Sequence, residues 1–133
     1  NLIKQLNKKN VKINITAVYS ANQVKKILRK IDKKTKVIIS IFAGRAGDTG
    51  NDPIPEFKKS LYLAKIFKNV EILWASVREP YNYIEAKRIG CHIITIPPAI
   101  ISKIENFGKS LSLLSLETVK GFLIDSKKSK FKI

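Results

Sequence analysis

Cysteine and histidine are almost missing from this sequence, and their scarcity excludes several kinds of site. The 133 residues include one cysteine, Cys91, and one histidine, His92. A lone cysteine rules out a disulfide framework and a cysteine-rich metal site, and it fits a reducing compartment, so we expect a cytoplasmic protein. Cys91 precedes an apolar segment and is predicted to be buried and inert. His92 has no histidine or cysteine partner at ligand spacing, so we expect no metal ion.

Long apolar runs are missing as well. A membrane-spanning helix needs about 18 apolar residues, and the longest apolar run, near residues 37–43, is far shorter. The first ten residues alternate between polar and apolar side chains, unlike the apolar region of a secretory signal. We therefore expect no membrane partner. Because the chain has no methionine and opens in an apparent helix, we interpret it as a piece of a longer protein.

Acidic residues are scarce, whereas lysine is abundant. Lysine and arginine number 26 against 10 aspartates and glutamates, so the net charge is +16. Such a charge favours binding to nucleic acids or anionic membranes. Only four basic residues are arginines, however, and arginine is the side chain that pairs with phosphate or guanine through two hydrogen bonds. We interpret the lysines as a solvated surface and expect no nucleic-acid partner, with a small basic nucleic-acid-binding module as the competing hypothesis.

The chain is rich in short apolar segments that alternate with amphipathic helical patterns. The β-branched apolar segments predict strands, and apolar side chains at helical spacing predict helices between them. The predicted strands are 11–18, 37–42, 70–77 and 92–96. The predicted helices are a short one closed by Asn10, then 21–31, 55–69, 80–89, 99–106 and 116–125, with a glycine-rich loop at 44–52.

Alternating strands and helices indicate an α/β fold with a parallel sheet that is covered by helices on at least one face. Four βα units make either a small open sheet or half of a TIM (β/α)8 barrel, since a whole barrel takes about 250 residues. We expect one partial domain over residues 1–133. Within it, residues 107–133 are predicted to form a carboxyl-terminal helix and a basic tail.

Polar side chains gather toward the carboxyl ends of three predicted strands, where α/β folds bind their ligands. Residues i and i+2 of a strand share a face, so these side chains form pairs. The pairs are Asn14 with Thr16, Ser40 with Phe42 just ahead of Arg45, and Ser76 with Arg78. Two arginines and several hydroxyl groups at one rim predict an anionic ligand that carries hydroxyl groups, and a sugar phosphate fits best. Each residue alone could instead be a surface ion pair or a strand-end cap.

Other nucleotide-binding and catalytic motifs do not fit. The glycines of the segment GRAGDTG, residues 44–50, lack the spacing and the ending of a Walker motif, and the dinucleotide pattern G-x-G-x-x-G is missing. No Ser-His-acid triad is predicted, because the single histidine lies at the amino end of its strand.

Four stretches of the sequence resemble the transaldolase family, which includes transaldolases and fructose-6-phosphate aldolases. The stretches are NITAVYSANQ (14–23), SIFAGRAGD (40–48), ASVREP (75–80) and GCHIITIPPA (90–99). They resemble the family's fifth to eighth strands in order, and the second one resembles the pattern S-P-F-V-G-R-x-x-D with Ile41 at the proline position. The match is collinear over about residues 10–106.

The resemblance implies strands five to eight of a TIM barrel and chemistry through a lysine Schiff base, with no cofactor. Such a transferase of the pentose phosphate pathway breaks the C3–C4 bond of a ketose phosphate and passes a dihydroxyacetone unit to an aldehyde phosphate. The implied partner is a sugar phosphate, and the full-length protein is expected to be a homo-oligomer. The site residues carried over are Thr16 near the catalytic water, Ser40 and Phe42 in the donor pocket, and Arg45, Ser76 and Arg78 around the phosphate. Asn14, on the same strand face as Thr16, is also expected to bind substrate.

The resemblance places the Schiff-base lysine in the fourth strand of the barrel, outside the matched stretches. Lys12 and Lys36 lie at the amino ends of predicted strands, so no lysine of this chain qualifies. We therefore predict the carboxyl-terminal half of a transaldolase, inactive alone, with open sheet edges that favour self-association. The alternatives are an aldolase-type lyase, which Phe42 disfavours because that branch tends to carry tyrosine there, and another sugar-phosphate barrel enzyme such as an epimerase or synthase.

Overall fold

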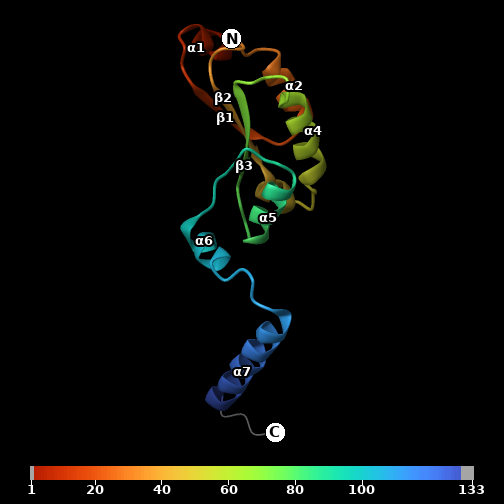
Figure 1. Ribbon diagram of the computed structural model, residues 1–133, viewed down its shortest axis with the longest axis vertical. Coiled ribbons are helices and arrows are strands. Elements are labelled where there is room, and N and C mark those ends of the chain that lie inside the picture. Colours follow the sequence, from red (N-terminus) through yellow and green to blue (C-terminus); the bar gives the residue numbers. More distant parts are fainter. Residues whose placement is uncertain (1, 130–133) are drawn as a thin grey trace. The chain divides into compact units, whose positions relative to one another are not determined.

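The computed structural model describes residues 2–129, and the chain divides into two compact units, Asn1–Ile101 and Ser102–Ile133. The first unit is built on one parallel sheet of four strands that follow one another in sequence order. These strands are β1 (Ile13–Val18), β2 (Val37–Phe42), β3 (Val70–Ala75) and β4 (Ile93–Ile94), the first three of which are labelled in Figure 1.

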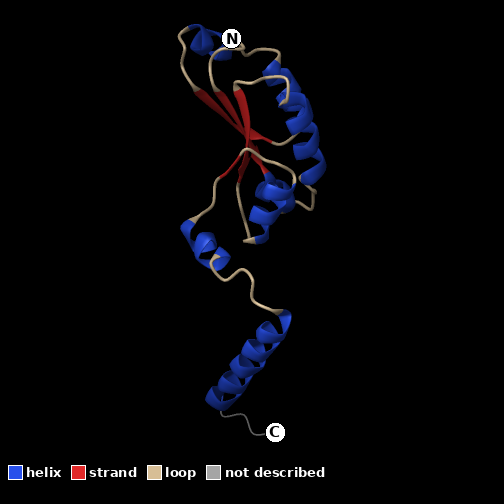
Figure 2. Ribbon diagram, in the orientation of Figure 1, coloured by secondary structure: helices blue, strands red, loops and turns tan. Residues whose placement is uncertain are grey.

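Helices connect the strands and cover one face of the sheet. In Figure 2, the helices that follow β1 and β2 run along the same side of the sheet. The helices of the described chain are α1 (Leu2–Lys8), α2 (Ala21–Leu28), α3 (Ala43–Gly47), α4 (Ile54–Ala64), α5 (Tyr81–Arg88), α6 (Pro98–Ile104) and α7 (Leu111–Ser129). A consecutive strand order with helices on one face is consistent with part of a (β/α)8 barrel, and the described sheet has no reversal of strand order of the kind found in doubly wound folds.

The core lies between the sheet and helices α2 and α4. Ile39 of β2 is aligned with Ile72 of β3, and Ile41 with Trp74, so these side chains form one apolar surface. All four are completely or almost completely buried. The ring of Phe57 from α4 stacks on Trp74 with 4.5 Å between the ring centroids. Since successive side chains of a strand point to opposite faces, Ile38, Ser40 and Phe42 of β2 lie on the other face of the sheet.

Strand β1 contains a bulge that the alternation pattern does not reveal. Ile15 is aligned with Ile39 and Val18 with Ile41, so β1 has one residue more than β2 between these two pairs. Ala17 absorbs the extra residue by adopting a φ of 58°. As a result Val18 returns to the core, where it is 3% exposed, while Thr16 stays exposed.

The predicted bounds agree best with the observed ones for a strand that is largely buried on both faces. The prediction for β2 is confirmed at both ends, whereas β1 begins later than predicted and β4 is limited to two residues. The prediction that β3 continues to residue 77 is wrong, because Ser76 adopts a φ of 64°, which ends the strand. The predicted loop at 44–52 contains the short helix α3, and helices α2 and α4 end before residues 31 and 69.

The second unit contains helix α7, which is longer than the predicted 116–125. Ser110 precedes this helix, and its hydroxyl accepts a hydrogen bond from the Leu113 backbone N–H at 3.2 Å. Lys109 forms an ion pair of 2.9 Å with Glu117 in its second turn. Among residues 2–129, no helix combines the length and the apolar character needed to cross a bilayer.

Candidate functional site

The candidate site lies where β2 and β3 end. Both strands are parallel, so the segments that follow them meet at one edge of the sheet. Arg45, in α3 after β2, and Arg78, three residues after β3, line the same hollow of about 870 Å³. The hollow is also lined by Tyr19 and by three acidic residues, Asp48, Asp52 and Glu56.

Arg78 is held by a two-pronged ion pair with Asp48. The Arg78 Nε donates to both carboxylate oxygens at 3.0 and 3.1 Å, and Nη2 donates to Oδ2 at 2.7 Å. The guanidinium lowers the pKa of Asp48 below its ordinary value, mainly through these hydrogen bonds, and the carboxylate raises the pKa of Arg78 in return. Both groups therefore stay charged, and one edge of the Arg78 fork is already occupied.

Arg45 is placed differently, because an aromatic ring rather than a carboxylate supports it. Its guanidinium carbon lies 5.3 Å from the centre of the Phe42 ring, a cation–π contact. The Tyr19 ring also contacts Phe42 in an edge-on orientation, with 5.9 Å between the ring centroids. The exposed Arg45 side chain forms no hydrogen bond or ion pair with another side chain of residues 2–129, although its charge helps to lower the pKa of Asp48. Arg45 is thus the cation of this hollow that no carboxylate holds by a direct bond.

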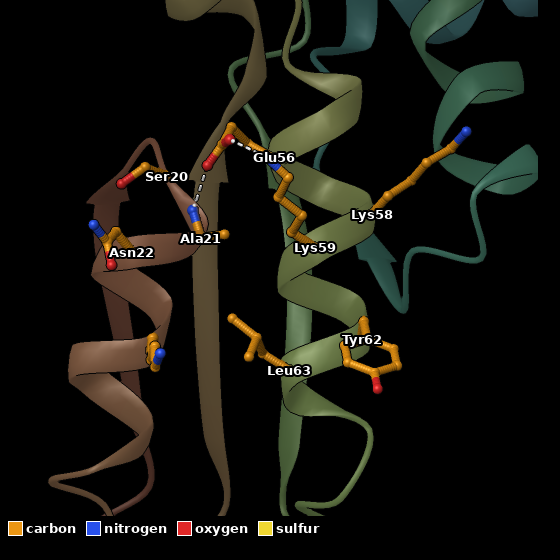
Figure 3. Close-up of a pocket in the computed structure, with 9 residues that line it drawn as sticks. Ser20, Ala21, Asn22, Glu56, Lys58, Lys59, Tyr62 and Leu63 are labelled. Carbon is orange, nitrogen blue, oxygen red and sulfur yellow. Dashed lines mark hydrogen bonds and ion pairs between the residues drawn. The ribbon is translucent and has the colours of Figure 1, made fainter.

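The other two carboxylates of the hollow are engaged by backbone N–H groups. The side chain of Asp52 accepts from the Ile54 N–H at 2.9 Å, at the start of α4. Glu56 accepts from the Ala21 N–H at 2.6 Å, which joins α4 to the first turn of α2 (Figure 3). These acidic residues were not predicted as part of the site. Only the spacing of Asp48 three residues after Arg45 hinted at one of them.

Glu56 also borders a second hollow, between α2 and α4 on the helical side of the unit. This hollow has a volume of about 820 Å³, and Figure 3 shows Lys58, Lys59 and Tyr62 of α4 around it. Glu56 lies 3.6 Å from the Lys59 amine. The predicted site residues do not line this hollow, so we do not assign it to the candidate site.

Gly44 lets the ends of β2 and β3 come unusually close together. A Cβ atom at this position would overlap the Ser76 carbonyl oxygen and would lie 2.7 Å from the Arg78 Cγ. Ser76 itself has a positive φ, and it lines a smaller hollow of about 280 Å³ together with Arg78 and Thr95. Arg78 therefore borders two adjoining hollows, with Ser76 in one and Arg45 in the other.

The remaining predicted residues lie on the sheet itself. Ser40 donates a hydrogen bond of 2.7 Å to the Asn14 side-chain oxygen, which joins β2 to β1 on the face opposite the helices. Thr16 is exposed in the bulge of β1 and lines neither hollow that Arg78 borders. The structure thus brings together Arg45 with Phe42, Ser76 with Arg78, and Asn14 with Ser40.

Comparison with known proteins decides the family. The whole chain, residues 1–133, matches the Transaldolase/Fructose-6-phosphate aldolase family. The chain belongs to this family. This confirms the resemblance that was based on the four strand-end stretches.

Curated relatives of the chain come from archaea and bacteria. A probable transaldolase of Nitrosopumilus maritimus is 34% identical over 105 residues, which are 75% of this chain and 44% of that protein. One from Novosphingobium aromaticivorans is 33% identical over 132 residues, 98% of this chain and 56% of the relative. One from Methanococcus vannielii is 30% identical over 113 residues, 84% and 50% of the two chains. The chain therefore spans about half the length of the curated relatives it matches.

The cysteine and the histidine of the described chain are placed unfavourably for nucleophilic chemistry. Burial raises the pKa of Cys91, so its thiol resists ionisation. His92 accepts a hydrogen bond from the Ile72 N–H through Nδ1 at 3.1 Å, at the amino-end side of β4. In the described part of the chain, no three histidine, cysteine, aspartate or glutamate side chains are grouped to hold a metal ion.

Lysines are numerous in this family member, but the four strands of the described sheet contain none. Lys36, immediately before β2, forms a 2.8 Å ion pair with Glu71 at the amino end of the sheet. A lysine that forms a Schiff base needs a desolvated position next to the substrate. The described strands offer no such lysine at their carboxyl ends.

Proposed function

We propose that this chain is the carboxyl-terminal half of a transaldolase, strands five to eight of its barrel, and that it supplies the phosphate-binding part of the active site. The observation that carries this proposal is the placement of Arg45 and Arg78 around one hollow at the carboxyl ends of β2 and β3. A ligand at the carboxyl ends of parallel strands is the usual arrangement in α/β barrels.

The chemistry of the hollow favours a phosphate ester. Arg45 has its full set of donors available, and Arg78 keeps Nη1 free of hydrogen bonds to the described residues. Guanidinium groups form paired, charge-assisted hydrogen bonds with phosphate oxygens. The Ser76 hydroxyl beside Arg78 can add a further donor, and the hydrogen-bonded pair of Asn14 and Ser40 offers amide and hydroxyl groups for sugar hydroxyls.

The proposed reaction proceeds through a lysine that this chain does not provide. The lysine amine attacks the carbonyl carbon of a ketose phosphate and water leaves, which forms an imine. The C3–C4 bond then breaks, an aldehyde phosphate departs, and the dihydroxyacetone unit stays on the lysine. This unit bonds to the carbonyl carbon of an acceptor aldehyde phosphate, and water releases the new ketose phosphate. Thr16 is proposed to lie near that water. The full-length protein is predicted to be a homo-oligomer.

The binding part of the proposal is tested by titrating the 133-residue chain with fructose 6-phosphate and following its amide and arginine NMR signals. We expect the signals of Arg45 and Arg78 to shift, and Arg78→Ala to weaken binding by roughly tenfold or more because a charge-assisted hydrogen bond is lost. Arg88→Ala is the matched control, since Arg88 is exposed on α5, where it contacts the hydroxyl and the ring of Tyr81, and it does not line the hollow. Equal loss in both variants, or no shift at either arginine, would contradict the proposal.

The claim that no lysine of this chain forms the Schiff base is tested separately. The chain is reduced with borohydride in the presence of fructose 6-phosphate and then analysed by mass spectrometry. We expect no covalent adduct, because the described strands hold no lysine. An adduct on any lysine of the chain would show that the assignment is wrong.

The competing nucleic-acid hypothesis makes an opposite prediction in salt. Binding through lysines would give tight association with oligonucleotides that weakens steeply as the salt concentration rises. We expect little oligonucleotide binding at 150 mM salt, roughly physiological ionic strength. Tight binding under these conditions, with no response to sugar phosphates, would favour the nucleic-acid module.

A further inference from the structure

Two strand ends contribute one side chain each to a shared ion pair. Asp48 ends α3, where its N–H donates to the Gly44 carbonyl at 2.8 Å, so β2 and α3 fix its position. Arg78 follows β3, and its backbone N–H donates to the Asn82 side-chain oxygen at 3.0 Å. The carboxylate of Asp48 therefore links two segments that are each held by their own strand and helix.

The ion pair leaves Arg78 with a defined free edge. Asp48 occupies Nε and Nη2, while Nη1 has no hydrogen bond to residues 2–129. Gly44 lies against the Arg78 Cγ and leaves room for the stem of the side chain. We propose that Asp48 is a positioning residue, which holds the Arg78 fork so that its Nη1 end is presented to an anion in the hollow. This inference rests on the proposed function, because it concerns the same phosphate site.

Removing the Asp48 carboxylate has opposite expected effects on anion affinity, depending on whether Asp48 acts through its charge or by orienting Arg78. The hollow is lined by two arginines and three carboxylates, so the loss of one carboxylate makes it more positive. If charge alone governed anion binding, the variant would bind phosphate more tightly. If Asp48 acts by orienting Arg78, the variant binds more weakly despite its more favourable charge, because the freed side chain loses a fixed geometry. The sign of the change distinguishes the two explanations.

Asp52 provides a matched control for the charge. It lines the same hollow, but its carboxylate accepts from the Ile54 N–H rather than from an arginine, and asparagine can keep that bond. We would measure the affinity of the full 133-residue chain for inorganic phosphate at constant ionic strength. We expect Asp48→Asn to bind about three- to tenfold more weakly, and Asp52→Asn to bind at least as tightly as the unaltered chain. Unchanged or tighter binding by Asp48→Asn would overturn the proposal.

A second readout needs no ligand. The Arg78 Nε–H, held by two carboxylate oxygens, is expected to give a resolved NMR signal with slow exchange with water. Asp48→Asn should lose this protection, while the signal of Arg88 should not change. Persistence of the slow signal in Asp48→Asn would contradict the positioning role. If the unaltered chain shows the slow signal but binds no phosphate, the proposed function is contradicted instead, so the two failures can be told apart.

Arg78→Lys gives a second test that leaves Asp48 unaltered. Lysine retains the positive charge but lacks the planar fork that Asp48 grips. We expect Arg78→Lys to weaken phosphate binding by a similar factor. The double variant, which combines Arg78→Lys with Asp48→Asn, is expected to bind phosphate no more weakly than Arg78→Lys alone. A further loss in the double variant would show that Asp48 acts independently of Arg78.

Discussion

The two ends of the sheet use polar side chains in opposite ways. At the amino end, polar residues from three connections bond to one another. The Asn69 amide donates to the Asp32 and Thr35 carbonyls at 3.0 and 2.7 Å, and Asp32 accepts from the Thr35 N–H at 2.7 Å. The side-chain oxygen of Asn7 accepts from the Asp32 N–H at 3.3 Å. These bonds stabilise the turns ahead of β2 and β3. Among the described residues, the Asn7 side-chain nitrogen and the Asn69 side-chain oxygen are buried here without a hydrogen-bond partner.

At the carboxyl end, the polar groups leave hydrogen-bonding capacity toward solvent. The Arg45 guanidinium lies over the Phe42 ring, and Arg78 keeps one end of its fork free of hydrogen bonds to the described residues. Ala17 and Ser76 also have positive φ angles here, whereas the positive φ at the amino end belongs to Asn10, a residue type that tolerates this conformation. The difference teaches that polar groups at the amino end serve the turns, whereas the carboxyl end retains exposed donors at the edge where parallel sheets bind ligands.

The largest expected effect comes from Gly44→Ala at the carboxyl end. The added Cβ would overlap the Ser76 carbonyl oxygen, and backbone atoms cannot move aside cheaply. We expect the free energy of unfolding to fall by about 3 kcal/mol, and phosphate binding to be lost, as measured by urea titration and calorimetry. Gly47→Ala in the same helix is the control, because no atom lies within 4 Å of its added Cβ. Similar losses in both variants would contradict the close-approach explanation.

A smaller effect is expected from Asn69→Ala at the amino end. Two backbone carbonyls lose their partner, so we expect the free energy of unfolding to fall by about 2 kcal/mol with unchanged phosphate affinity. Asn106→Ala is the comparison, since that exposed amide makes a single bond of 3.3 Å to the Ser102 carbonyl. A loss of phosphate affinity in Asn69→Ala would break the division of roles between the two ends.

Ser20→Ala tests a structural polar group at the carboxyl end. Ser20 caps α2, where its hydroxyl accepts from the Gln23 N–H and the Gln23 side chain accepts from the Ser20 N–H. We expect a loss of about 1 kcal/mol in unfolding free energy, without a change in phosphate affinity. Ser20→Asp keeps a capping oxygen and should retain most of the stability. An unchanged melting temperature in Ser20→Ala would show that this capping box contributes nothing measurable.

The smallest effect is a difference in how salt acts on two acidic residues. The pKa of Asp32 lies below its ordinary value of 3.8, chiefly because the N–H groups of Thr35 and Lys34 bond to it, whereas the Arg78 side chain lowers the pKa of Asp48. Both carboxylates stabilise the fold above pH 3.8, and this stability is lost as the pH falls through their lowered pKa values. In NMR titrations, added salt should raise the pKa of Asp48 more than that of Asp32. Equal shifts would contradict the different causes.

Much of the fold could be predicted because burial on both faces leaves a clear pattern. The apolar run of β2 predicted its bounds fully, and the placement of Arg45 and Arg78 after two such strands predicted one shared rim. Strand ends and loops were harder, since a single positive φ at Ser76 ends β3 without any change in hydrophobic pattern. The same applies to the bulge at Ala17, which depends on the alignment of β1 with β2.

Local patterning was therefore sufficient for the order of strands and helices and for the chemical types of residue at the rim. It could not reveal which charges meet, because Asp48 and Arg78 lie 30 positions apart and become partners only when β2 and β3 align in parallel. Nor could it show that Gly44 lies against Ser76, since such a contact depends on the packing of two chain segments. Periodicity records whether a side chain is buried, while the pairing of distant groups is set by the three-dimensional alignment of strands.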